Sequence, residues 1–356
     1  MKALIAAGGH GTRLRPLTYT INKHLVPLAN KPMIYYALEK VAETKIKEVA
    51  ININQGDKEI KQIVGSGKKW GLNITYLEQA GGALGVAHVV KNALDWIGKD
   101  DLLFYLGDNI VLAPLQKLID KFKKKQLDCL LGLTKVSDPE RFGVPVFDKQ
   151  GRLLKIEEKP QKPKSDYAVT GIYIYSNAVR EAVQKIQPGP RGELEISDVH
   201  TYLIETNKKV GYEELTGWWK DTGKPDVLLE GNSLILANIE LDIKGKVKKG
   251  AIIEGKVIIE KGTQIAKNCL IRGPVVIGKN CKLENTTIEP YTSIGDNCDI
   301  QGAEISHSII CDEAKINCNK RIVDSLIGPA AQVSSQKATK PSGHKLILGN
   351  NTLVEL

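Results

Sequence analysis

Aliphatic residues recur at every sixth position over the last third of the chain. The series runs without a slip from Val247 to Leu283, resumes after one shortened step at Ile288, and resumes again at Ile310. Its anchors are Val247, Ile253, Ile259, Ile265, Ile271, Ile277, Leu283, Ile288, Ile294, Ile300, Ile310, Ile316 and Ile322. In a repeat of this kind each hexad forms one face of a triangular coil, and the anchors stack along the axis. The sequence therefore predicts a parallel β-helix domain over 239–356, with a last strand in 345–356.

The repeat resembles the left-handed β-helix of hexapeptide-repeat proteins. In those proteins the coil either assembles subunits or forms acetyltransferase sites between the subunits of a trimer, so both roles stay open. His307 lies within the repeats, and we prefer assembly because a single histidine on such a coil is more often structural. Cys269, Cys281 and Cys298 each precede an anchor by two residues. Small side chains pack there, which predicts buried thiols.

A glycine-rich turn follows the first apolar run of the chain. Residues 2–7 read as a buried strand, and residues 8–13 continue as Gly-Gly-His-Gly-Thr-Arg. Glycines let backbone N–H groups face a chain of phosphates, and the Arg13 guanidinium matches phosphate oxygens. Lys23 adds a second cation ten residues on. The turn is neither a Walker P-loop nor the dinucleotide fingerprint, so its residues alone leave a solvated surface turn as an equal alternative.

Strand-like and helix-like segments alternate after this turn. Residues 48–53, 72–77 and 101–106 read as strands, and 58–64 reads as a helix. A helix is also expected over 30–45, with Asn30 as its cap. This alternation predicts a Rossmann-like, mostly parallel α/β sheet over 1–238, with ligands bound at the carboxyl ends of its strands.

The motif Gly-Gly-x-Gly-Thr-Arg-Leu-x-Pro at 8–16, followed by Lys-x-Leu-x-Pro at 23–27, resembles the signature of the sugar-1-phosphate nucleotidylyltransferases. The nearest resemblance is to the long-form thymidylyltransferases, which carry an added C-terminal domain, and it covers essentially the whole chain. It implies that a catalytic domain over 1–238 transfers a nucleotidyl group from dTTP to glucose 1-phosphate with Mg²⁺ and releases pyrophosphate.

The resemblance also implies roles for individual residues. Nucleotide binding falls to Gly8, Gly9, Gly11, Thr12, His24, Gln79 and Gly85, and catalysis to Arg13, Lys23 and Lys159. Sugar-phosphate binding falls to Gly143, Glu158, Lys159, Val169 and Arg191, and metal binding to Asp108 and Asp221. The residues themselves support part of this, because an amide can read a pyrimidine edge and a carboxylate at a strand end suits Mg²⁺.

The chain departs from the family pattern at two positions. His24 stands where short-form members have a glutamine that touches the thymine, and Phe142 stands where the family often has tyrosine. UTP or an amino-sugar phosphate therefore remains an alternative substrate. A bifunctional enzyme that also transfers an acetyl group is a second alternative. A non-catalytic regulatory subunit is the third, and the presence of every charged signature residue argues against it.

Composition limits the class of protein further. The net charge is +9, but the lysines are scattered and no basic motif interleaved with aromatic residues occurs, so nucleic acid is not an expected partner. No apolar run reaches the roughly 20 residues that span a bilayer. The six cysteines include no C-x-x-C pair, which favours free thiols over disulfides. We expect a cytoplasmic enzyme that acts as a homo-oligomer.

Overall fold

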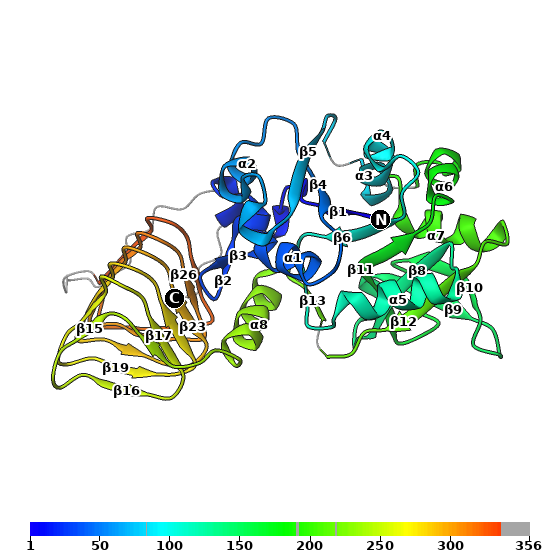
Figure 1. The fold of residues 1–356 in the computed structure, drawn as a ribbon. Coiled ribbons are helices and arrows are strands. Elements are labelled where there is room, and N and C mark those ends of the chain that lie inside the picture. Colours follow the sequence, from blue (N-terminus) through cyan, green and yellow to red (C-terminus); the bar gives the residue numbers. More distant parts are fainter. Residues whose placement is uncertain (83, 190–191, 218, 336–356) are drawn as a thin grey trace. The chain divides into compact units, whose positions relative to one another are not determined.

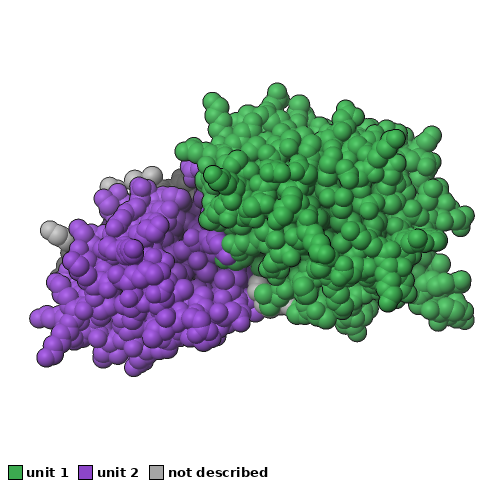
Figure 2. Space-filling view, viewed as in Figure 1, with its two compact units in different colours: residues 1–10, 34–221 green, residues 11–33, 222–356 purple. Residues whose placement is uncertain are grey.

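The structure is a computed structural model that describes residues 1–335 except 83, 190, 191 and 218 (Figure 1). The chain divides into two compact units, residues 1–10 with 34–221 and residues 11–33 with 222–356 (Figure 2). The predicted boundary at residue 239 precedes the first strand of the repeat region, β14, which begins at Asp242. The division into a catalytic domain over 1–238 and a repeat domain over 239–356 remains a prediction.

The first unit is built on a seven-stranded, mostly parallel sheet in the order β12-β8-β11-β6-β1-β4-β5. Strand β11 is antiparallel to β6 and β8, while the β1–β4, β1–β6, β4–β5 and β8–β12 pairs are parallel. The sheet comprises β1 (Lys2–Ala6), β4 (Glu48–Asn54), β5 (Asn73–Gln79), β6 (Leu102–Leu106), β8 (Cys129–Lys135), β11 (Tyr167–Tyr175) and β12 (Val210–Glu214). The predicted α/β sheet is confirmed.

Two short antiparallel pairs accompany this sheet. They are β7 (Asn109–Val111) with β13 (Trp219–Asp221), and β9 (Gly143–Phe147) with β10 (Leu153–Glu158). The helices of the first unit are α2 (Glu59–Val64), α3 (Val86–Asn92), α4 (Leu94–Ile97), α5 (Leu115–Lys125), α6 (Val179–Lys185) and α7 (Ile196–Glu205), together with α1 (Met33–Ala42) at its start. The connections that carry these two pairs leave the same sheet edge as the carboxyl ends of β1, β5 and β6.

The expected start of the first long helix is wrong. Helix α1 begins at Met33, and the backbone before it forms the hairpin of β2 (Pro27–Leu28) and β3 (Lys31–Pro32). Asn30 lies in that hairpin turn with a φ of 61°, a left-handed conformation that asparagine tolerates. The Asn30–Pro32 pattern therefore marked a turn and not a helix cap.

The second unit contains a three-sided β-helix made of parallel sheets. Each side stacks one short strand per coil, consistent with the left-handed β-helix expected from the hexads. The first side is β14 (Asp242–Ile243), β17 (Val257–Ile259), β20 (Val275–Ile277), β23 (Thr292–Ile294), β26 (Ile309–Ile310) and β29 (Leu326–Ile327). The second is β15 (Lys246–Val247), β18 (Gln264–Ile265), β21 (Lys282–Glu284), β24 (Asp299–Gln301), β27 (Lys315–Asn317) and β30 (Gln332–Ser334), and the third is β16 (Ile252–Glu254), β19 (Leu270–Arg272), β22 (Thr287–Ile288), β25 (Glu304–Ser306) and β28 (Arg321–Val323).

The hexad anchors form the interior of this coil. From Ile259 to Ile316 the predicted anchors are buried and stack in register from coil to coil. Ile305 is an additional anchor, fully buried and paired with Ile288 and Ile322. It escaped the prediction because the step into it is five residues long. The strand expected in 345–356 lies outside the described residues.

The cysteines behave as small apolar side chains. All six are buried with free thiols, and Cys269, Cys281 and Cys298 belong to the interior of the coil. Cys281 and Cys298 precede Leu283 and Ile300, which are register partners one coil apart. The expectation of buried thiols is confirmed.

Asn232, in helix α8 (Pro225–Leu236), ties the hairpin before α1 to the coil. Its Oδ1 accepts the Ala29 N–H at 2.7 Å, and its Nδ2 donates to the Tyr291 carbonyl at 3.2 Å. Asn30 adds a donation from Nδ2 to the Ile294 carbonyl at 2.5 Å. These bonds agree with the division of the chain, in which α8 and the β2–β3 hairpin belong to the same unit as the coil.

An anchor near the middle of the coil allows the stacked core to be tested. Ile277→Ala is expected to lower the free energy of unfolding by about 2–5 kcal/mol, because the neighbouring coils cannot collapse into the space left behind. Ile252→Ala is the matched control, since Ile252 is 54% exposed. Urea unfolding of both variants measures the effect, and equal losses would contradict the assignment of Ile277 to the core.

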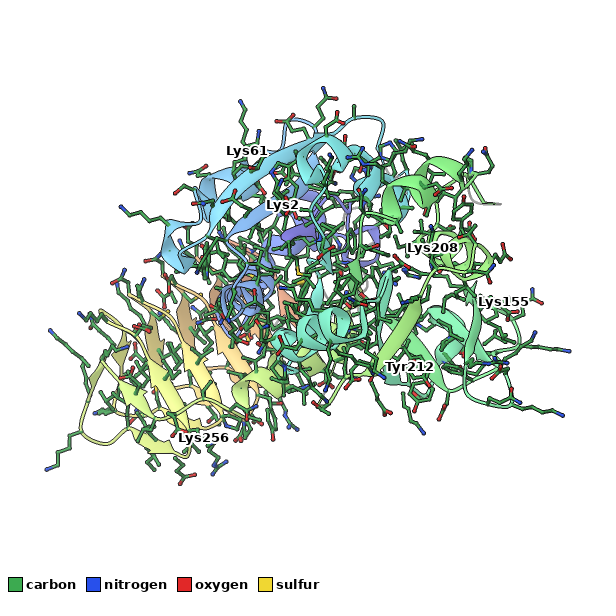
Figure 3. The ribbon with its side chains drawn as sticks, turned by 45° about the vertical axis from the view of Figure 1, so that its right-hand side comes forward. Lys2, Lys61, Lys155, Lys208, Tyr212 and Lys256 are labelled. Atoms are coloured by element: carbon green, nitrogen blue, oxygen red, sulfur yellow. The ribbon has the colours of Figure 1, made fainter. Side chains whose placement is uncertain are left out.

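Basic residues of the described part of the chain lie on many separate elements of the surface (Figure 3). Lys61, Lys155 and Lys256 illustrate this (Figure 3), and many such lysines pair with neighbouring carboxylates, as Lys61 does with Glu78. None of the helices in the described part of the chain is long and apolar enough to cross a membrane.

Candidate active site

Two carboxylates far apart in the sequence are brought together at the carboxyl end of β6. Asp108 follows β6 in a tight turn and directly precedes β7, and Asp221 ends β13. The antiparallel ladder between β7 and β13 pairs Asp221 with Asn109, the residue next to Asp108. Of the two aspartates that the family resemblance singled out, Asp221 therefore lies at the end of this small ladder and Asp108 directly precedes it.

A second group forms where β9, β10 and β11 meet. Glu158 is the register partner of Gly143, and a Cβ at position 143 would lie 3.6 Å from Glu158 Oε2 and 3.7 Å from Val169 Cβ. Three of the residues predicted to bind the sugar phosphate thus converge on one point. The tightest contact of such a Cβ would be with Ile156 Cγ2 at 3.2 Å, whereas its distance to the carboxylate is an ordinary van der Waals contact.

Lys159 is fixed beside this carboxylate by its backbone. Its φ is 45°, and its N–H donates to the Phe142 carbonyl at 2.9 Å. The ammonium lies 3.1 Å from Glu158 Oε1, while about half of the Lys159 side chain remains exposed. The pair can therefore open toward an anionic ligand without losing a buried contact. Arg191, the other predicted phosphate ligand, lies outside the described residues.

Two residues beside Glu158 were missed in the sequence. Ser197, at the start of α7, donates its hydroxyl to Glu158 Oε2 at 2.9 Å. Burial, and then the charge of Glu158, raise the pKa of the Asp198 carboxyl above its ordinary value. Both residues belong to the 191–198 segment from which Arg191 was selected. A hydroxyl next to an acid is common at helix starts, so the pattern alone carried no signal.

Gln79, predicted to read the base, is held by a relay of amides. It ends β5 and is buried, its Oε1 accepts from Asn52 Nδ2 at 3.3 Å, and its Nε2 donates to the Gly82 carbonyl at 2.8 Å. Asn92 Nδ2 in turn donates to Asn52 Oδ1 at 3.2 Å. The relay leaves Gln79 one N–H and one lone pair for a ligand. Asn52 and Asn92 were not predicted.

Gly8 lies beside the same relay. A Cβ at Gly8 would come within 3.3 Å of Asn52 Nδ2 and 3.2 Å of Asn54 Oδ1, so the turn after β1 passes close to these amides. Gly9 continues the turn and is exposed. The glycines of the signature thus keep the backbone free of side chains at the carboxyl end of β1, as expected for phosphate binding.

Gly85 has a structural requirement of its own. Its φ is 97°, and a Cβ there would lie 2.3 Å from the Leu194 carbonyl oxygen. Leu194 also accepts the N–H of Ala87 and donates to the carbonyl of Leu84. The space expected for a base at Gly85 is thus taken, on the side where a Cβ would point, by the backbone of Leu194.

The cationic part of the signature lies in the second unit. Gly11, with a φ of 60°, caps the short 3-10 turn Thr12–Leu14, and a Cβ there would lie 2.9 Å from Lys23 Cβ. Thr12 and Arg13 are exposed, while Lys23 is buried. The two cations that the resemblance assigns to the leaving group are therefore linked through Gly11.

His24, which replaces the family's glutamine, is buried with its ring anchored. Nδ1 lies 3.1 Å from Asn22 Oδ1, and the same oxygen accepts the His24 backbone N–H at 2.9 Å. Because an amide oxygen only accepts, this contact assigns the imidazole proton to Nδ1. The local hydrogen bonds thus give the histidine a fixed orientation that does not depend on a ligand.

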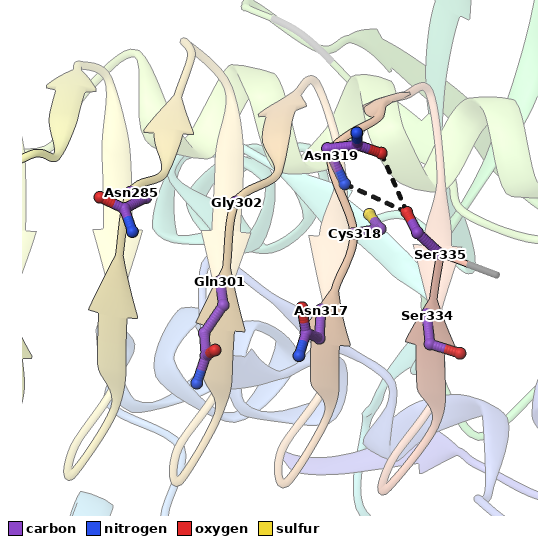
Figure 4. A pocket seen from close by; sticks show the side chains of 8 residues that line it. All are labelled: Asn285, Gln301, Gly302, Asn317, Cys318, Asn319, Ser334 and Ser335. Atoms are coloured by element: carbon purple, nitrogen blue, oxygen red, sulfur yellow. Dashed lines mark hydrogen bonds between the residues drawn. The ribbon is translucent and has the colours of Figure 1, made fainter. Parts of the chain in front are cut away.

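Two grooves lie away from the predicted site residues. One, of about 660 Å³, is at the opposite ends of the sheet strands and is lined by Asp101, Asp128, Arg180 and Lys208 among others. The other, of about 480 Å³, follows one face of the coil and is lined by amides and hydroxyls such as Gln301 and Asn319 (Figure 4). Neither contains a predicted catalytic residue.

Comparisons with known proteins agree with this geometry. A family model described as nucleotidyl transferase matches residues 2–238. The chain belongs to this family. A glucose-1-phosphate thymidylyltransferase of Streptomyces antibioticus is 41% identical over 100% of this chain and 99% of its own. A low-salt glycan biosynthesis nucleotidyltransferase of Haloferax volcanii is 39% identical and covers 100% of both chains.

A solved structure extends the comparison. It is described as that of a Bacillus anthracis glucose-1-phosphate thymidylyltransferase in complex with sucrose, and it matches with a TM-score of 0.63 and 36% identity over 68% of this chain and 98% of its own. This nucleotidyltransferase is thus an enzyme with relatives that share its full length and its long form. The family and the reaction class that the sequence predicted are confirmed.

Enzymes of this family generally use a divalent metal ion. Within the described residues no group of three or more His, Cys, Asp or Glu side chains gathers as a metal cage. A hard cation that takes one or two carboxylates, with phosphate oxygens and water completing its shell, suits the Asp108 and Asp221 arrangement. The donor set therefore fits a divalent cation held by few carboxylates.

Proposed function

We propose that this nucleotidyltransferase transfers a thymidylyl group from dTTP to glucose 1-phosphate, giving dTDP-glucose and pyrophosphate. The observation that carries the proposal is the β7–β13 ladder, which pairs Asp221 with the residue that follows Asp108, beside the strand end expected to meet the triphosphate. The names of the full-length relatives support the choice of substrates.

The reaction needs no protein nucleophile. An oxygen of the sugar phosphate, already ionised, attacks the α-phosphorus, the bond from that phosphorus to the bridging oxygen breaks, and pyrophosphate leaves in line. Catalysis is then positioning and neutralisation of charge. Mg²⁺, bound through Asp108 and Asp221, would neutralise charge on the α-phosphate.

The chain's own residues divide the remaining work. Arg13 and Lys23 would hold the departing pyrophosphate, and Lys159 would bring the sugar phosphate against the nucleotide. Glu158, oriented by Ser197, would accept bonds from sugar hydroxyls. Gln79 would donate to and accept from the base with the one N–H and one lone pair that its amide relay leaves.

The nucleotide and sugar are tested together. We expect pyrophosphate release with Mg²⁺ to be fastest for dTTP with glucose 1-phosphate in a grid of dTTP, UTP, ATP, GTP and CTP against glucose, N-acetylglucosamine, galactose and mannose 1-phosphates. If another pair reacted fastest, the proposed mechanism would stand but the substrate assignment would change. His24 would then be the first residue to substitute. If folded protein released no pyrophosphate with any of these pairs, the result would contradict the enzyme assignment and favour a scaffold role.

The coil is assigned to assembly. Acyl transfer is the alternative that His307 raised. The observation available for it is the exposed contact of His307 Nδ1 with Asp324 Oδ1, which are 2.5 Å apart at a corner of the coil. A homo-oligomeric state and a cytoplasmic location remain predictions of the sequence.

A further inference from the structure

The side chain of Asn109 is buried beside the first aspartate of the candidate metal site. It is 1% exposed and begins β7, directly after Asp108 and opposite Asp221 in the ladder. Its Oδ1 accepts two hydrogen bonds, from Trp219 Nε1 at 2.6 Å and from the Gly171 N–H at 3.2 Å. Its Nδ2 donates to Asp108 Oδ1 at 2.8 Å.

These bonds determine which way the amide faces. An indole nitrogen and a backbone N–H are donors only, so the oxygen of Asn109 has to face Trp219 and Gly171. The amide nitrogen then has to face Asp108. The fit is tight, because a Cβ at Gly171 would lie 2.8 Å from Asn109 Oδ1. The orientation of this side chain is therefore built into the unliganded protein.

Trp219 connects the amide to the second aspartate. Trp219 and Asp221 are two residues apart in β13, so their side chains emerge on the same face of the strand. The indole is nearly buried, and its ring meets Phe142 edge-on at 5.3 Å between centroids. The hydrogen bond from Trp219 to Asn109 thus ties the strand of Asp221 to the residue that contacts Asp108.

We propose that Asn109, held by Trp219, is a positioning residue that orients the Asp108 carboxylate toward the divalent cation. The proposal rests on the metal role of Asp108 in the proposed function. By donating to one carboxylate oxygen, Asn109 limits the rotation of Asp108 and holds its carboxylate in one direction. Hydrogen-bond partners of this kind commonly change metal affinity by about 10- to 100-fold when they are removed.

Direct cation binding tests the proposal without relying on turnover. The free Mn²⁺ signal in electron paramagnetic resonance is followed while the full chain is titrated with Mn²⁺ alone. We expect Asn109→Ala to weaken Mn²⁺ binding by about 10-fold or more, and Trp219→Phe, which keeps the ring but removes the donor, to weaken it in the same direction. Trp70→Phe, far from the ladder in sequence and on the 3-10 turn Lys68–Trp70, is the matched control.

The outcomes separate the two proposals. If Asp108→Asn binds Mn²⁺ like the unchanged protein, the metal role of Asp108 itself fails. If Asp108→Asn loses Mn²⁺ while Asn109→Ala and Trp219→Phe bind it normally, the positioning role is overturned and the proposed function stands. Should Asn109→Ala fail to fold because it leaves two buried donors unpaired, Trp219→Phe decides the question alone, with its circular dichroism as the check on folding.

A second readout distinguishes positioning from a general structural role. The Mg²⁺ concentration for half-maximal pyrophosphate release is expected to rise with the Mn²⁺ dissociation constant in both variants, while turnover at saturating Mg²⁺ recovers. A loss of turnover that Mg²⁺ does not restore would contradict the role assigned to Asn109.

Discussion

Asp108→Asn is expected to lower the turnover number by about 10²- to 10³-fold, because it removes a charge that the cation needs while keeping the size of the side chain. Asparagine retains an oxygen that can accept the bond from Asn109 Nδ2, so the β7 turn should survive. Turnover is measured as pyrophosphate release at saturating substrates over a series of Mg²⁺ concentrations. Asp221→Asn is expected to behave alike, since Asp221 sits opposite Asn109 in the same ladder.

The control for this variant lies at the other end of the same strand. Asp101 immediately precedes β6, whereas Asp108 follows it, and Asp101 lines the groove away from the site. Asp101→Asn should stay within about a factor of two of the unchanged protein, as surface substitutions usually do. Near-normal turnover in Asp108→Asn would remove this carboxylate from the mechanism.

The coil was predictable because its structural period appears in the sequence as an aliphatic residue at every sixth position. Each hexad places one aliphatic residue inward, so the anchors from Ile259 to Ile300 could be assigned one by one. Ile305 was missed because the count shifts by one where a turn shortens. The failure at Asn30 has another cause: an asparagine two residues before a proline suits a hairpin turn as well as a helix start, and the pairing of β2 with β3 decided between them.

The candidate site was predictable only as far as the family resemblance reached. Asp108 and Asp221 lie in segments whose pairing depends on how β7 and β13 meet, which no local pattern encodes. Asn109 was passed over because an asparagine after a strand is usually a turn residue, and its two acceptor bonds come from remote segments. Ser197 was missed for the same reason. Residues that orient other side chains depend on tertiary packing, so no characteristic spacing in the sequence identifies them.

Gly85 is the reverse case. The sequence identified it as a site residue, but the reason for its being glycine was incomplete. The resemblance assigns it to the base, whereas the structure requires glycine there for a φ of 97° and for the approach of the Leu194 backbone. Both requirements can act on one position. A glycine in a family motif therefore identifies a backbone constraint without saying whether a ligand or the protein itself imposes it.

Arg13→Ala is expected to lower turnover by about 10²-fold with a smaller change in KM, because charge accumulates on the departing pyrophosphate mainly in the transition state. Arg13 is exposed in the short turn capped by Gly11, so its loss should leave the stability of the fold nearly unchanged. Arg15→Ala is the matched control, since the Arg15 guanidinium lies over the Tyr19 ring at 4.8 Å. Single-turnover pyrophosphate release, together with KM for dTTP, separates the two effects. A loss below about threefold would exclude Arg13 from charge stabilisation, and an equal loss in Arg15→Ala would mean that the turn as a whole, rather than one guanidinium, supports the leaving group.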